Sequence, residues 1–136
     1  MEYRNVFIKV AEDCPVREAE VPVAKTEKKP QHLIQYELLT QHPYHYDHKS
    51  LIFALYRIRN GLPEHLPKAE REQLWNALFS KGHPCLRASA LTKRYGFGAH
   101  YDAEGKIALY PLGSREYARF LTDKTIKVVP AMKSKR

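Results

Sequence analysis

The densest group of side chains that could do chemistry surrounds Cys85. His83 precedes it by two residues and Arg87 follows it by two. In an extended segment, residues two apart share a face, so these three side chains would line one side of a strand. A cationic neighbourhood favours the thiolate, which is the nucleophilic form of cysteine. The spacing is compatible with a cysteine nucleophile that uses His83 as its base, or that recruits His100 or His42 through folding.

A simpler interpretation of Cys85 is a small buried hydrophobic residue between Pro84 and Leu86, which is how free cysteines usually behave. No signature of a known cysteine–histidine enzyme accompanies it. Cys14, which stands before Pro15, is interpreted in the same way. A disulfide between Cys14 and Cys85 is not expected in a reducing compartment.

The same stretch also favours the binding of an anion. Arg87 offers a planar pair of donors to a phosphate or carboxylate, and Lys93 and Arg94 add positive charge. Residues 81–100 contain four basic and no acidic side chains. The full candidate set for ligand or anion binding is Cys85, Arg87, Lys93, Arg94, Tyr95 and His100.

Gly96 and Gly98 fall on one face of the strand predicted at this point. Glycines leave the backbone open either to a ligand or to a packed helix, and helix packing is the simpler reading. Gly-Phe-Gly is not a phosphate-binding loop. It does not connect a strand to a helix, and no Lys-Ser or Lys-Thr pair follows it. A binding site here requires the glycine ribbon and the basic stretch before it to form one recess.

Three histidines, His42, His45 and His48, are spaced by three residues. With Asp47 they could in principle bind zinc or nickel. Their spacing does not force them to converge and does not match a helical i, i+4 pair. Surface histidines sensitive to pH are the simpler interpretation, and the sequence predicts no metal and no other cofactor.

Tyrosines are frequent, with nine in the chain. Several of them could form an aromatic wall for a planar ligand or for nucleic-acid bases, or could pack on helices with their hydroxyls in water: Tyr44, Tyr46, Tyr95, Tyr101 and Tyr110.

Composition limits the classes that need to be considered. A chain of 136 residues is the length of a single domain, predicted here as 1–136. No run approaches the roughly 18 apolar residues of a membrane span, and no leader opens the chain, so we expect a cytoplasmic protein. The net charge of +8 indicates an anionic partner. Mobility is expected in the polar loop 12–29 and in the basic tail 133–136.

Periodicity and end signals predict the elements. In order, they are a strand at 5–11, a helix from Pro30 that ends before Pro43, a helix at 48–60, a helix from Pro67 to Lys81-Gly82, a hairpin at 95–112, a short helix after Ser114 and a strand at 125–129. An additional strand at 85–90 is an option. The irregular order favours an α+β fold, with a mainly antiparallel sheet and three to four helices packed on one face.

Four segments carry a family resemblance: VFIKVAEDCPV at 6–16, IQYELLTQHPY at 34–44, KGHPCLRASALTKRYGFGAHYDAEGKIALY at 81–110 and the C-terminal AMKSKR. They resemble a family of small bacterial proteins of unknown function. The resemblance implies a bacterial, stand-alone, single-domain protein. It implies no activity, cofactor or catalytic residue.

The leading hypothesis is a non-enzymatic binding or interaction module for an anionic small molecule or partner, acting through Arg87, Lys93 and Arg94. An alternative is a small enzyme with Cys85 as nucleophile. A second alternative is non-specific nucleic-acid binding through the basic surface, although no nucleic-acid-binding motif supports it. The sequence does not specify the oligomeric state.

Overall fold

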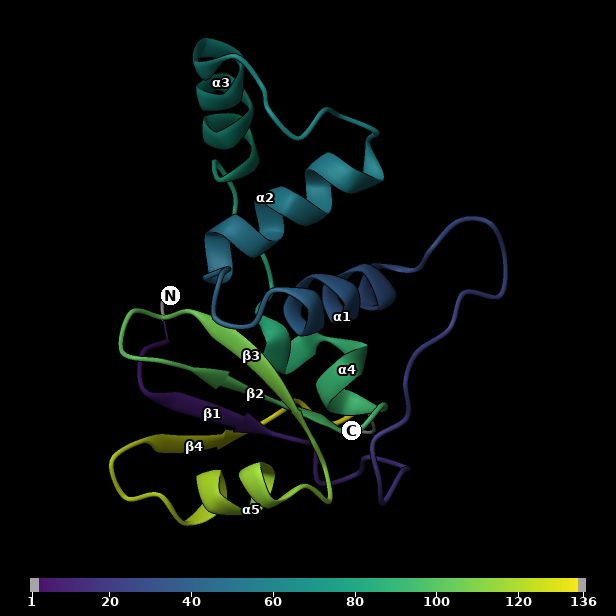
Figure 1. Ribbon diagram of the computed structural model, residues 1–136, viewed down its shortest axis with the longest axis vertical. Helices are drawn as coiled ribbons and strands as arrows, with labels where there is room; N and C mark the ends of the chain where they lie inside the picture. Colours follow the sequence, from purple (N-terminus) through teal and green to yellow (C-terminus); the bar gives the residue numbers. More distant parts are fainter. Residues whose placement is uncertain (1–2, 135–136) are drawn as a thin grey trace.

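The computed structural model describes residues 3–134 and forms a four-stranded sheet with helices on both sides (Figure 1). The elements are β1 (Val6–Lys9), α1 (Gln31–Gln41), α2 (His48–Arg59), α3 (Lys68–Leu78), the 3₁₀ turn η1 (Leu86–Ala88), α4 (Ala90–Lys93), β2 (Phe97–Tyr101), β3 (Ile107–Pro111), α5 (Arg115–Thr122) and β4 (Lys127–Pro130). These bounds confirm the predicted α+β class and every element of the main prediction.

The sheet has the order β3-β2-β1-β4. β1 pairs antiparallel with β2, and β2 pairs antiparallel with β3, as the predicted hairpin requires. β4 runs parallel to β1, with Phe7 beside Val128, so the sheet is mixed rather than purely antiparallel. The paired strands β1 and β4 therefore come from opposite ends of the chain.

One face of the sheet forms the main core. Val6 and Ile8 point to this face, and their antiparallel neighbours Tyr101 and Ala99 point there too. The helices supply the other half of this cluster through Ile34, Leu38, Leu39, Leu51, Ala54 and Leu55. α1 and α4 lie on the sheet, α2 lies on α1, and α3 extends beyond α2 (Figure 1).

The opposite face of the sheet is covered by α5 (Figure 1). Phe7 is fully buried there, with its ring centroid 4.9 Å from that of Phe120 and 5.1 Å from that of Tyr117. A Cβ atom at Gly98 would overlap the Phe7 ring and lie 2.8 Å from the Tyr117 ring. Gly98 thus allows close packing, which confirms the simpler interpretation of the bare strand face. The expectation of helices on one face alone needs correction, because α5 adds a second layer.

The optional strand at 85–90 is wrong, because this segment folds into η1 and α4. Local side chains satisfy its backbone: Ser89 accepts a hydrogen bond from the Leu91 N–H, and the buried Thr92 hydroxyl donates to the Leu86 carbonyl. These local hydrogen bonds satisfy backbone groups that, in an extended segment, would have to pair with a neighbouring strand. The turn places Cys85 just before a compact, locally hydrogen-bonded segment.

Contacts also hold parts of the segments for which the sequence predicts mobility. In the loop 12–29, the Glu20 N–H donates to the Tyr95 carbonyl at 2.8 Å. In the tail, Lys133 pairs with Glu12 at 3.1 Å, while residues 135–136 lie outside the described residues. Among residues 3–134, no helix is long and apolar enough to cross a membrane.

Candidate functional site

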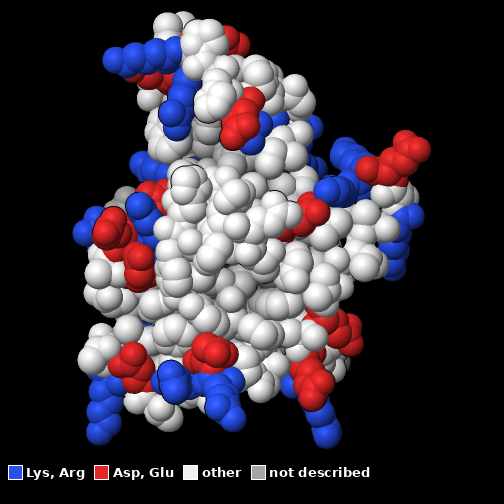
Figure 2. Space-filling view, in the orientation of Figure 1, with Lys and Arg blue, Asp and Glu red and all other residues white. Residues whose placement is uncertain are grey.

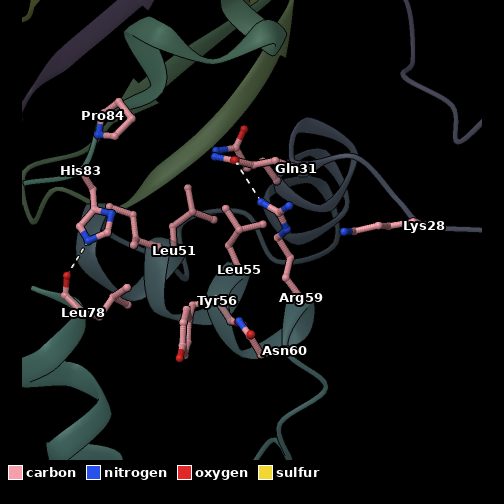
Figure 3. A pocket seen from close by; sticks show the side chains of 12 residues that line it. Lys28, Gln31, Leu51, Leu55, Tyr56, Arg59, Asn60, Leu78, His83 and Pro84 are labelled. Atoms are coloured by element: carbon pink, nitrogen blue, oxygen red, sulfur yellow. Dashed lines mark hydrogen bonds between the residues drawn. The ribbon is translucent and has the colours of Figure 1, made fainter.

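A groove of about 380 Å³ opens between α1, α2 and the segment that follows α3 (Figure 3). Its lining combines long polar side chains at the rim with aliphatic side chains at the base. The lining residues are Lys28, Gln31, Gln35, Leu51, Ile52, Leu55, Tyr56, Arg59, Asn60, Leu78, His83 and Pro84. None of these described lining residues is acidic, so the groove has a positive balance.

One end of the groove is cationic. Arg59, in the last turn of α2, extends toward α1, where its Nη1 donates to the Gln31 side-chain oxygen at 3.4 Å (Figure 3). Lys28 reaches the same end from the loop before α1 (Figure 3). A guanidinium held by a neutral amide keeps its full charge and retains further N–H donors for a ligand. This end can therefore accept a carboxylate, sulfonate or phosphate.

The base of the groove is apolar because α2 is only partly covered by its neighbours. Leu51 and Leu55 are buried and belong to the main core, while Ile52 and Tyr56 are half-buried along the same helix. Covering this surface with a ligand's apolar body would remove it from water. The base thus suits a hydrocarbon or aromatic body attached to an anionic head.

The other end of the groove carries the imidazole of His83 (Figure 3). Its Nε2 lies 2.6 Å from the Leu78 carbonyl oxygen. A carbonyl only accepts, so Nε2 carries a proton and donates it in this bond. The groove therefore has a cationic end and an imidazole end, separated by an apolar base.

A second hollow of about 320 Å³ lies on another side of α2. It is lined by residues of both charges, including Arg57, Arg71 and Glu64. An acidic side chain beside the two guanidiniums reduces the net attraction for an anion. The groove between α1 and α2 is consequently the better anion site of the two.

The basic surplus does not form a strip on the face that Figure 2 shows. Lys and Arg side chains alternate with Asp and Glu near the edges of the described surface, and the middle of this face, over α1 and β3, is uncharged. A nucleic-acid interface usually gathers its basic residues on one face or along one helix. This face lacks that pattern.

The structure separates the candidate residues that the sequence grouped together. Cys85 and Arg87 lie on the main-core side of the sheet, with η1 and Tyr101. His100 neighbours Tyr101 in β2, so it points to the opposite face, where it stacks on Phe120 at 4.3 Å. The common recess expected from the sequence is therefore not formed, because alternation along β2 divides its members.

The basic part of the set has its own positions. The Arg87 Nε donates to the Pro130 carbonyl at 2.8 Å, which ties η1 to the end of β4. Lys93 and Arg94 stand at the end of α4, and Arg94 is exposed. Tyr95 stacks on His32 of α1 at 4.9 Å, and burial lowers the pKa of that histidine. None of these four sequence-predicted residues lines the α1–α2 groove.

The candidate tyrosines are also divided between the faces. Tyr101 belongs to the main core, whereas Tyr44 and Tyr110 join His100 on the α5 side. Burial and the hydrogen bond to Tyr110 raise the pKa of the Tyr44 phenol. An aromatic wall shared by all five candidate tyrosines is not present.

The histidine-rich loop before α2 makes a helix cap. Asp47 accepts a hydrogen bond from the Ser50 N–H at 2.9 Å, and the Ser50 hydroxyl accepts one from the Asp47 N–H at 2.9 Å. The His42 and His45 rings are 5.9 Å apart. Within residues 3–134, no group of three or more His, Cys, Asp or Glu side chains is arranged to hold a metal ion.

Sequence comparison places the whole chain in one family. A family model described as a family of unknown function, DUF6157, matches residues 1–136. The chain belongs to the DUF6157 family. No curated protein and no solved structure matches it. The DUF6157 match confirms the resemblance seen in the sequence, and arguments about function depend on the site itself.

Sequence reasoning missed the groove of this DUF6157 protein. Its two ends come from residues distant in the sequence: Gln31 opens α1, Arg59 closes α2, and His83 follows α3. The one signal in the sequence is the high density of apolar residues in α2, because such a helix is usually buried on more than one side. Which side of α2 stays open depends on the position of α3, and this position is not encoded in the pattern of apolar residues.

Proposed function

We propose that this protein is a binding module for a small anionic molecule with an apolar body. The observation that carries the proposal is the groove between α1 and α2, where Arg59 and Lys28 mark one end and Leu51 and Leu55 form the base. No acidic residue is among its described lining residues. The proposed ligand is anionic, as expected from the sequence, but its site is the groove between α1 and α2 rather than the stretch around Arg87.

The size and chemistry of the groove support a small molecule. Pockets that hold small ligands usually measure about 300–1,000 Å³, and this one, at about 380 Å³, lies at the small end of that range. Each buried methylene contributes about 0.8 kcal/mol, so an apolar body that covers the half-buried Ile52 and Tyr56 would add to the affinity. The cationic end would orient the ligand and select against neutral analogues.

Isothermal titration calorimetry with octanoate and 1-octanol tests the proposal. We expect octanoate to bind more tightly than 1-octanol, because only the carboxylate pairs with Arg59. The R59Q variant should weaken octanoate binding about tenfold, since a charge-assisted hydrogen bond contributes about 1.5–3 kcal/mol. R119Q changes an exposed arginine of α5, away from the groove. It is the matched control and should bind octanoate as the wild type does. Equal binding of both ligands, or equal effects of both variants, would contradict the proposal.

A cysteine enzyme has less support than a binding module. His83 uses Nε2 to bind the Leu78 carbonyl, and His100 lies across the sheet from Cys85. A general base must come within hydrogen-bond reach of the nucleophile's proton. For non-specific nucleic-acid binding, a salt titration with random oligonucleotides discriminates, because phosphate contacts weaken steeply with salt.

The proposed setting is the cytoplasm of a bacterial cell. Cys14 and Cys85 are both free thiols, which fits a reducing compartment. The bacterial source follows from the resemblance described above.

A further inference from the structure

A hollow of about 350 Å³, here called the lysine hollow, adjoins the groove between α1 and α2, because His83 lines both of them. It lies between the first turn of α2 and the segment that follows α3. Its lining residues are His48, Lys49, Phe79, Ser80, Lys81, Gly82 and His83. None of these described lining residues is acidic. The imidazole end of the groove therefore meets a second place with a positive balance.

Two lysines give the lysine hollow its charge. The Lys49 Nζ lies 5.4 Å from the centroid of the Phe79 ring, so a cation–π contact holds one ammonium group at the wall. Lys81 is exposed and forms no ion pair among residues 3–134. An anion that entered the lysine hollow would thus meet two ammonium groups that no acidic lining residue neutralises.

The two imidazoles shape the lysine hollow more than they charge it. His83 is fixed by the hydrogen bond from its Nε2 to the Leu78 carbonyl, and its ring meets the Phe79 ring edge-on at 5.6 Å. His48 is half-buried, and burial lowers its pKa, which favours the neutral ring. The lysines are consequently the groups that would pair with an anion.

Asp47, the acidic residue next to His48 in the chain, does not line the lysine hollow. Its Oδ1 accepts hydrogen bonds from the N–H and the hydroxyl of Ser50, both at 2.9 Å. The carboxylate is therefore committed to the cap of α2, and it is not placed among the lining lysines.

The lysine hollow and Arg59 stand at opposite ends of α2. A helix rises about 1.5 Å per residue, so His48 and Arg59, its first and last residues, differ by about 16 Å along the axis. Leu51 and Leu55, at the base of the groove, lie between these ends (Figure 3). A ligand whose apolar body covers this base can pair with both ends only if it carries an anionic group at each of its own.

We propose that the ligand of the groove is an extended molecule with two anionic ends, of the dicarboxylate class. One carboxylate would pair with Arg59 and the other with Lys49 and Lys81. A methyl terminus at the lysine end would leave both ammonium groups without a partner, whereas a carboxylate there would gain charge-assisted hydrogen bonds. This inference rests on the proposed function, because it takes the same groove and adds a second anionic group to its ligand.

Calorimetry with matched pairs of ligands tests for the second anionic group. Suberate, sebacate and dodecanedioate are each compared with the monocarboxylate of the same carbon number, namely octanoate, decanoate and dodecanoate. We expect at least one dicarboxylate to bind about fivefold more tightly than its monocarboxylate, which is the gain typical of ion pairs at exposed side chains. Without the lysine pairing, the second carboxylate would weaken binding, because a charge would replace an apolar methyl group. The sign of the difference therefore decides.

The K81Q variant tests where the second carboxylate lies. It should weaken binding of that dicarboxylate about threefold and leave its monocarboxylate unchanged, because only the dicarboxylate reaches Lys81. K124Q, which changes an exposed lysine between α5 and β4, is the matched control and should leave both unchanged. In NMR spectra, the backbone amides of Ser80 and Gly82 should shift with the dicarboxylate and not with the monocarboxylate.

The outcomes separate this inference from the proposed function. If no dicarboxylate binds more tightly than its monocarboxylate, or if K81Q weakens both ligands equally, the assignment of a second anionic end is overturned. Binding of octanoate that still depends on Arg59 would then leave the proposed function standing. If none of the ligands binds, or if R59Q affects none of them, both proposals fail.

Discussion

The phenolic oxygen of Tyr44 lies 2.8 Å from Nδ1 of His100 and 2.7 Å from the hydroxyl of Tyr110. The loop that carries Tyr44, between α1 and α2, also pairs with β3 through its backbone. The Tyr44 N–H donates to the Ile107 carbonyl, and the Ile107 N–H donates to the Tyr46 carbonyl, both at 2.9 Å. Residues 44–46 thus cover the outer edge of β3. This protects the sheet from edge-to-edge pairing on that side.

Removing the Tyr44 hydroxyl tests this attachment. Y44F should lower the free energy of unfolding by about 1–2 kcal/mol, because His100 and Tyr110 lose a partner in a half-buried site. Y46F is the matched control, since its hydroxyl makes no hydrogen bond within the described residues, and it should change stability by less than about 0.5 kcal/mol. Urea denaturation measures both, and equal losses would show that the loop is not held by this bond.

The state of His100 makes stability depend on pH. Burial lowers its pKa below the usual 6.5, while Asp102 and Asp123 oppose this shift. The unfolded chain then binds a proton more readily than the folded one, so stability is complete above about pH 6.5 and falls as the pH drops through that value toward the folded pKa. Burial lowers the pKa of His32 and His48 as well, in the same direction.

Comparing wild type with H100Q isolates the contribution of His100. The loss of unfolding free energy between pH 7.5 and pH 5.5 should be smaller in H100Q, because one titrating group has been removed. Parallel curves for the two proteins over this range would show that burial of His100 does not contribute to the pH dependence.

Two glycines test the packing of α5 on the sheet. G98A should destabilise the protein by about 1–3 kcal/mol, because the added methyl group overlaps Phe7 and Tyr117. At Gly82 an added Cβ meets nothing within 4 Å, so G82A should stay within about 0.5 kcal/mol of the wild type. Thermal unfolding compares them, and a well-tolerated G98A would mean that α5 does not lie closely on β2.

Thr92 tests why the chain after Cys85 is not a strand. T92V should cost about 1 kcal/mol, because the buried hydroxyl donates to the Leu86 carbonyl that η1 presents. T40V removes a similar bond to the Tyr36 carbonyl at an exposed position and should have a smaller effect. If the two substitutions were equally mild, the hydroxyl of Thr92 would not be what holds η1.

Local signals explain how much of the fold could be predicted. The hairpin was readable because Asp102–Gly105 has turn chemistry, with Asp102 accepting from the Glu104 N–H and Gly105 at φ 82°. The cap at Ser114 was readable too, since its hydroxyl accepts from the Tyr117 N–H. Periodicity gave no information on the parallel pairing of β4 with β1, which joins the two ends of the chain.

The site could not be predicted in the same way, because it depends on long-range packing. Side-chain alternation along β2 correctly puts Tyr101 and His100 on opposite faces of the sheet. The recess expected from the sequence nevertheless combined residues from both faces. The position of Arg59 opposite Gln31 depends on how α2 crosses α1, and no spacing in the sequence encodes that. The sequence therefore leads to the hypothesis of an anionic ligand, whereas the groove proposed to bind it depends on how the helices pack.

The most direct test of the central proposal is to locate a bound anion by NMR. Octanoate is titrated into ¹⁵N,¹³C-labelled protein while amide and methyl chemical shifts are recorded. We expect the largest shifts at Leu51, Leu55 and Gln31, no shifts in α5, and loss of these shifts in R59Q. Shifts centred instead on Arg87, Lys93 and Arg94, or shifts that persist unchanged in R59Q, would contradict a ligand site between α1 and α2.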